Sequence, residues 1–305
     1  MKYQNNVIEY RMSFKRILYI AICCFPTLGC VTALGQFEKD FNISKSVANP
    51  VAIGSKQVPL PPGNWIIASR GVTTNNLNDT LLRLILINAD ANSDSMAVEI
   101  LTNAEASNSG VGWRPLETCT RKDLLSPSPS AAYSAGDEEC WFINHSTMTR
   151  SSRTSDLRSQ ALNFAHSQGV KIPVNSVYVG YRFADAQDYL TVRYFFNPEA
   201  KNLAPPTYAA WRNSDWHRDR IQNFPRKLAY FEELKQWGEG WFSNLKAGFA
   251  GKLVNVKRPT QLPEPSNPDN SKIENRLLKL DELLKKKVIK PREYEDRRRQ
   301  ILKEL

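Results

Sequence analysis

Two strand-like segments joined by a short loop constrain this chain most strongly. Residues 176–183 (SVYVGYRF) and 189–196 (YLTVRYFF) are rich in β-branched and aromatic side chains, and only ADAQD separates them. A connection of this length joins antiparallel neighbours, because a parallel pair needs a crossover of about a dozen residues or more. The two segments therefore predict a β-hairpin and an antiparallel sheet.

Four more segments of similar composition extend the expected sheet to six strands. Residues 65–69, 81–88, 97–103 and 140–145 are short apolar runs bounded by polar or turn-forming residues. A sheet of this kind needs helices to cover it. The fold class we expect is α+β: a mainly antiparallel sheet covered by long helices, plus a detached C-terminal two-helix hairpin.

Two segments of the body have helical periodicity. In residues 155–169, Ser155 or Asp156 can cap the start and Gly169 can end the helix. A longer helix begins at Pro225, and its apolar stripe, with Gly238 filling one turn, consists of Leu228, Phe231, Leu234, Trp241 and Leu245. Such a stripe packs on a sheet or, as an alternative, lies on a membrane surface.

The positive charge is concentrated at the two ends of the chain. Of the net charge of +10, residues 1–35 carry +3 and residues 272–305 carry +5, which leaves +2 for the body. A nearly neutral body argues against a basic groove for DNA or RNA, so we expect no nucleic-acid partner.

Residues 1–35 have the pattern of a signal peptide. Lys15 and Arg16 precede a short apolar run, and small residues follow up to Gly35. Cleavage after Gly35 or after Ala33 fits this pattern. The expected location is the periplasm or the exterior.

Two other readings of this segment stay open. Residues 17–34 are just long enough to remain as an inner-membrane anchor. The sequence TLGC, which ends at Cys30, resembles a lipoprotein cleavage box, although Thr27 and Leu28 depart from it. In that case the protein would be lipidated at Cys30.

Only two of the five cysteines lie outside the signal segment. In an exported chain, Cys119 and Cys140 predict a disulfide, with two free thiols as the alternative. Such a bridge contributes about 3 kcal/mol in the chain-entropy model. The chain has no CxxC pair, so we expect no metal site.

The sequence contains no catalytic fingerprint of the GxSxG, HExxH, P-loop or Rossmann type. We therefore assign no catalytic residue and expect no cofactor. One histidine stands out, because His217 lies between Asp215 and Asp219 and could act as a general base. The alternative is a loop histidine with solvated neighbours.

The chain divides into segments by composition. After the signal segment, we expect a loose leader over 36–56 and a globular α+β domain over 57–255. Residues 256–271 contain four prolines and no periodicity, which indicates an extended linker. Residues 272–305 then predict a helical hairpin.

The apolar residues of this hairpin recur at helical spacing, and the turn VIKP separates the two helices. Helices this short bury little surface and gain stability by meeting a copy or a partner. The expected association surface consists of Leu277, Leu280, Leu284, Tyr294, Ile301 and Leu302.

Residues 273–305 resemble the SHOCT domain, a short C-terminal domain of many bacterial proteins. The resemblance rests on the leucine spacing, on VIKPREY from Val288, on three consecutive arginines and on the pair Ile301-Leu302. Lys287 and Lys290 stand where the family usually has glycine and threonine or serine. The resemblance implies a bacterial source and a small association module.

Together these features predict an exported, non-enzymatic envelope protein of bacteria. It would assemble with itself, or dock to another envelope protein, through residues 272–305. The basic tail also fits an anionic membrane surface. The alternative is a periplasmic hydrolase that uses His217 with Asp215 or Asp219.

Overall fold

The structure is a computed structural model. It describes residues 33–75, 78–90, 93–107, 113, 119, 121–126, 132–134, 137–148, 156–203, 210–254, 256, 268–286 and 288–302. The expected signal segment therefore lies outside the described residues, apart from positions 33–35.

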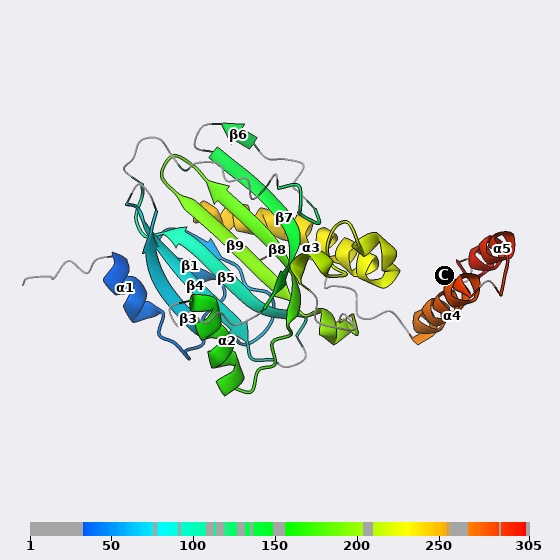
Figure 1. The fold of residues 1–305 in the computed structure, drawn as a ribbon. Helices are drawn as coiled ribbons and strands as arrows, with labels where there is room; N and C mark the ends of the chain where they lie inside the picture. Colours follow the sequence, from blue (N-terminus) through cyan, green and yellow to red (C-terminus); the bar gives the residue numbers. More distant parts are fainter. Residues whose placement is uncertain are drawn as a thin grey trace, which may run out of the picture. The chain divides into compact units, whose positions relative to one another are not determined.

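The body is built on a seven-stranded sheet in which every neighbouring pair is antiparallel (Figure 1). The strand order is β3-β4-β5-β9-β8-β7-β6. This confirms the predicted α+β class, with one strand more than expected. The strands are β3 (Trp65–Thr74), β4 (Thr80–Asn88), β5 (Ser95–Asn103), β6 (Ala132–Ser134), β7 (Asp137–Thr147), β8 (Asn175–Ala184) and β9 (Tyr189–Phe196).

The sheet consists of two meanders that meet in its middle. Strands β3, β4 and β5 are consecutive along the chain, as are β6, β7, β8 and β9. The meanders are joined by pairing of β5 with β9, which places Glu99 opposite Arg193. This central pairing positions the charged groups described below.

The long helix α3 (Pro225–Phe249) packs on one face of the sheet. The predicted stripe faces the core: Leu234, Trp241 and Leu245 are almost fully buried among strand residues. Gly238 allows close approach, because a Cβ there would lie 2.9 Å from the Trp141 ring. The apolar stripe is thus used in the core and not on a membrane surface.

The shorter helix α2 (Leu157–Ser167) packs on the opposite face (Figure 1). Asp156 caps its start by accepting a hydrogen bond from the Ser159 amide, and Gly169 follows its end at φ +71°. Ala161 and Ala165 lie against Ile85 and other residues of β3 and β4. Part of this face remains uncovered by α2 and carries polar side chains.

The loose leader predicted for residues 36–56 is wrong. This segment contains most of α1 (Ala33–Asp40) and of the hairpin of β1 (Val51–Ile53) and β2 (Lys56–Val58). Phe37 and Phe41, one helical turn apart, are buried in the same core cluster as Val51 and Ile53. The apolar residues of this segment are sparse, and most of the large ones are at least partly buried, whereas Ile43 is 48% exposed.

Two further boundaries differ from expectation. The loop between the cysteines contains β6, and Ser126 forms a bridge with Ile143. The linker predicted to reach residue 271 ends earlier, because α4 (Pro268–Lys285) starts at Pro268, where proline suits the first helical turn. After a turn, α5 (Pro291–Leu302) completes the C-terminal pair.

Candidate functional sites

The C-terminal helices α4 and α5 share a small apolar cluster. Leu280 and Ile301 are buried in it, and Leu277, Ile289 and Tyr294 pack around them. The Tyr294 hydroxyl also donates a hydrogen bond to Asp281 Oδ1 at 2.6 Å. All described members of this cluster belong to α4, α5 or the turn between them, so the pair has a core of its own.

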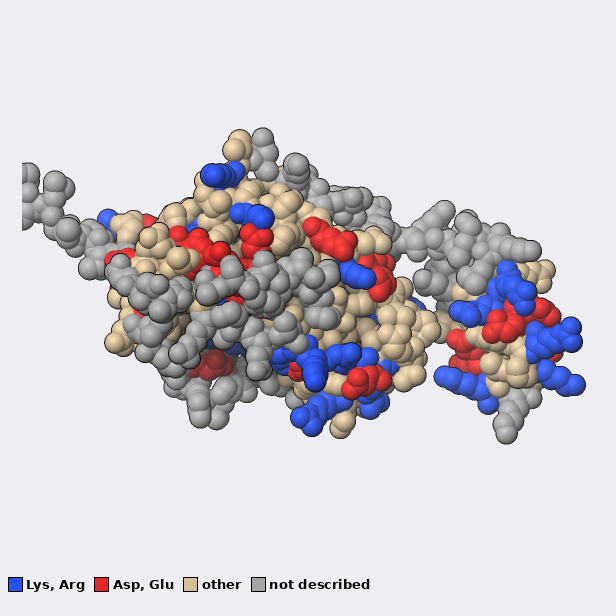
Figure 2. All heavy atoms as spheres, turned by 90° about the horizontal axis from the view of Figure 1, so that it is seen from above, with Lys and Arg blue, Asp and Glu red and all other residues tan. Residues whose placement is uncertain are grey.

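Most residues of the expected association surface pack inside the helix pair. Leu277, Leu280, Tyr294 and Ile301 hold the two helices together, while Leu284 is partly exposed. The side chain of Leu302 lies outside the described residues. Among the described side chains of the pair, the large apolar ones that are exposed are Leu278 (41%) and Val288 (65%), with interspersed basic and acidic groups around them (Figure 2).

The surroundings of His217 separate its two acidic neighbours. Asp215 forms a buried ion pair with Lys227 at 2.8 Å, so it is engaged with α3. Asp219 Oδ2 lies 3.5 Å from His217 Nδ1, and the Asp219 side chain is 74% exposed. The linings of the two described cavities include none of His217, Asp215 and Asp219.

The contacts of His145 indicate a structural role. Its Nε2 donates to the Trp211 carbonyl at 3.0 Å, the Trp211 indole donates to the His145 carbonyl at 3.1 Å, and the two rings stack. Burial lowers the pKa of His145 to about 4, although the bond to Trp211 favours the charged form. His145 is therefore neutral at pH 7 and fastens the segment after β9 to β7.

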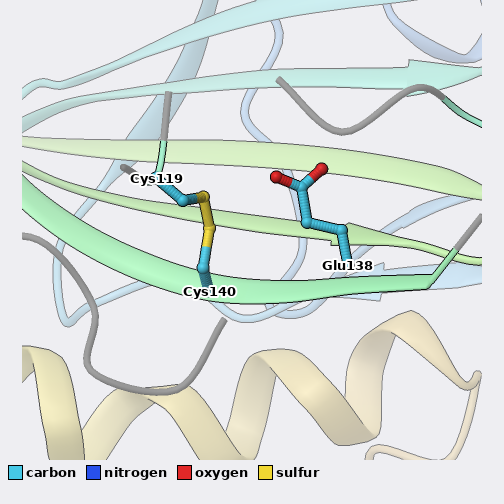
Figure 3. A group of neighbouring side chains, drawn as sticks. All are labelled: Cys119, Glu138 and Cys140. Carbon is cyan, nitrogen blue, oxygen red and sulfur yellow. A yellow bond between two sulfur atoms is a disulfide. The ribbon is translucent and has the colours of Figure 1, made fainter. Parts of the chain in front are cut away.

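Cys119 and Cys140 form a disulfide whose Cα atoms are 6.1 Å apart. The Glu138 carboxylate lies beside it (Figure 3), and one donor atom from each of the three residues falls within 4.8 Å of the others. With the sulfurs bonded to each other there are no thiolates to bind a metal. Glu138 instead accepts a hydrogen bond from the buried Arg182 guanidinium.

The sequence did not indicate a charged cluster on the face of the sheet that α2 partly covers. Arg83 of β4, Arg158 of α2 and Arg193 of β9 surround the buried carboxylate of Glu99 in β5. Arg83 Nε donates to Glu99 Oε1 at 2.7 Å, while Arg158 and Arg193 approach Oε2 to 3.3 and 3.4 Å. Burial raises the pKa of Glu99, but the three guanidiniums outweigh it and hold the pKa below its usual value.

A cavity of about 290 Å³ opens beside this cluster. Its wall combines guanidinium, carboxylate, hydroxyl and aromatic groups from five strands of the sheet. In the sequence, each of these charged residues lies within an otherwise apolar strand, which marks it as unusual. Which strands pair, and therefore which charged residues meet, could not be predicted from the local sequence. The lining residues are Thr73, Arg83, Glu99, Leu101, Arg182, Tyr189, Thr191 and Arg193.

Comparison of the chain with protein-family models, curated proteins and solved structures finds no match. Within the described part of the chain, we find no helix with the length and apolar character needed to cross a bilayer.

Proposed function

We propose that the chain is a non-enzymatic, exported envelope protein of bacteria that docks through its C-terminal helix pair, to a second copy or to another envelope protein. The observation that carries this proposal is the separate apolar cluster of α4 and α5, whose described members all belong to the pair and the turn within it. A segment with its own core can serve as a module, and the resemblance to the SHOCT domain supports an associating one.

The size of the pair favours association. Among its described side chains, its core has two buried residues with three partly buried ones around them, too few to make a small hairpin very stable alone. Binding to a partner adds stability by mass action. Leu278 and Val288 would supply apolar contact area for that partner. Separately, the disulfide between Cys119 and Cys140 in the body supports export to an oxidising compartment.

Docking is preferred to the hydrolase alternative on the geometry around His217. One of its two acidic neighbours is paired with Lys227, and the other is largely exposed. Neither carboxylate is therefore a shielded partner that would orient His217 as a general base. Activity lost on His217→Ala in a substrate screen would reverse this preference.

The test compares the solution mass of residues 33–305 with that of 33–256, by light scattering. Self-association predicts that the longer chain is an oligomer and the shorter one a monomer. The double variant Leu278→Ser/Val288→Ser should weaken the oligomer while helicity is retained. Leu280→Ser is the contrasting variant, because it should unfold the pair itself.

If both chains are monomers, self-association is wrong. Docking to another envelope protein then predicts that a photo-crosslinker at position 288 captures one partner, and that the double serine variant loses it. Salt-sensitive sedimentation with anionic vesicles would instead assign the tail to a membrane surface. No captured partner and no vesicle binding would overturn the docking proposal.

A further inference from the structure

We infer that the arginine-lined cavity on the sheet binds a small organic dianion through a carboxylate or phosphate group. This inference concerns the body of the protein and goes beyond the docking function proposed for the helix pair.

The cluster around Glu99 has an excess of positive charge. Three guanidiniums share one carboxylate, which leaves two positive charges around Glu99. The second ion pair of the cavity, Arg182 with Glu138, is neutral in total and does not offset this excess. A ligand with two negative charges would balance the cluster.

Hydrogen-bonding capacity gives the same result. A guanidinium has five N–H donors, whereas a carboxylate has about four acceptor positions, so Glu99 cannot satisfy three arginines. Among the described residues, the buried Nε of Arg193 meets no hydrogen-bond acceptor. The side chains of Arg83 and Arg193, which both line the cavity, are 28% and 31% exposed, so their remaining donors are accessible. Arginine forks of this kind match carboxylate and phosphate oxygens.

The cavity is organised before any ligand arrives. The Arg182 guanidinium lies 4.6 Å over the Tyr189 ring, and Tyr189 stacks on Trp113 with ring centroids 5.0 Å apart. Thr191 donates a hydrogen bond to the Tyr189 hydroxyl at 2.8 Å. Since the lining residues belong to strands, little ordering would be needed on binding.

The volume sets the size of the ligand. A cavity of about 290 Å³ corresponds to about ten water molecules at roughly 30 Å³ each. This suits a small metabolite and is at the lower end of the usual range for ligand pockets.

The experiment is calorimetric titration of residues 33–305 with inorganic phosphate and, separately, with succinate. Chloride at the same ionic strength is the reference. We expect saturable 1:1 binding of at least one of the two anions, and the stronger one identifies the ligand chemistry. Arg193→Gln should weaken it roughly tenfold to a hundredfold, which corresponds to one or two charge-assisted hydrogen bonds.

Three other variants sharpen the test. Arg193→Lys keeps the charge but loses the fork, so its affinity should lie between wild type and Arg193→Gln. Glu99→Gln removes the internal anion and should bind the ligand more tightly. Arg218→Gln changes the net charge equally at a residue outside the cavity lining, and should leave the affinity unchanged.

Two results would overturn the inference. The first is that neither anion binds more tightly than chloride. The second is that Arg218→Gln weakens binding as much as Arg193→Gln, because the effect would then be general electrostatics. If Arg193→Gln fails to fold, Arg83→Gln takes its place with the same expectation.

Discussion

A glycine in α3 offers the sharpest test of the packing. A Cβ added at Gly248 would lie 1.9 Å from the carbonyl oxygen of Gln57 in β2, far inside van der Waals contact. That oxygen belongs to the backbone of a short hairpin strand, so it cannot move aside as a flexible side chain would. The helix and the β1–β2 hairpin would have to separate.

The expected cost of Gly248→Ala follows from two opposing effects. Alanine is favoured over glycine inside a helix by about 1 kcal/mol. Overpacking costs about 1–3 kcal/mol or more, and the upper end applies here because the obstacle is backbone. We therefore expect the free energy of unfolding to fall by about 2 kcal/mol. The melting temperature should fall by about 4–8 °C for a chain of this size.

The control is the same substitution at Gly240, an exposed position in the same helix. Gly240→Ala should raise the free energy of unfolding by up to about 1 kcal/mol, since only helix propensity changes. Urea and thermal unfolding of both variants measure the difference. If Gly248→Ala is as stable as Gly240→Ala, the close approach of α3 to β2 is refuted.

Three further predictions concern the disulfide, a buried histidine and a buried ion pair. Replacing Cys119 and Cys140 by serine should lower the free energy of urea unfolding by about 3 kcal/mol for a separation of 21 residues, and an unchanged midpoint would contradict this. The pKa of His145 is about 4 when folded and 6.5 ordinarily, so the unfolded chain binds more protons between these values. Stability should therefore be full above pH 6.5 and fall by about 3 kcal/mol as the pH drops to 4; in His145→Gln this part of the pH slope should vanish. Asp215→Asn leaves Lys227 buried without its counter-ion and should cost about 3 kcal/mol, part of which Lys227→Met in the same chain recovers; equal stability of both variants and wild type would argue against the ion pair.

The elements predictable from the sequence are those defined by local pattern. The two segments around ADAQD could only form a hairpin, and the stripe ending at Leu245 could only be one side of a helix. The α1–β1–β2 region could not be predicted, because Phe37 and Phe41 are a single pair at helical spacing, too few to show a period, and Val51 follows in a strand of three residues. The β1–β2 hairpin also packs against α3, almost two hundred residues further along the chain.

The arginine cluster could not be predicted from the sequence for a related reason. Arg83, Glu99 and Arg193 each looked like one polar residue in an apolar strand. Their meeting depends on which strands are neighbours and on the register between them. A shift of one residue would turn a side chain to the opposite face of the sheet.

The pairing of β5 with β9 also bears on the order of folding. It closes a loop of about 85 residues, at an entropic cost of about 4 kcal/mol, whereas the connections within each meander are mostly shorter. Each meander should therefore form early and the central pairing late. Glu99 and Arg193 face each other across that pairing. A ligand bound beside them would therefore stabilise the strand pair that forms last during folding. It would slow unfolding and leave the folding rate almost unchanged.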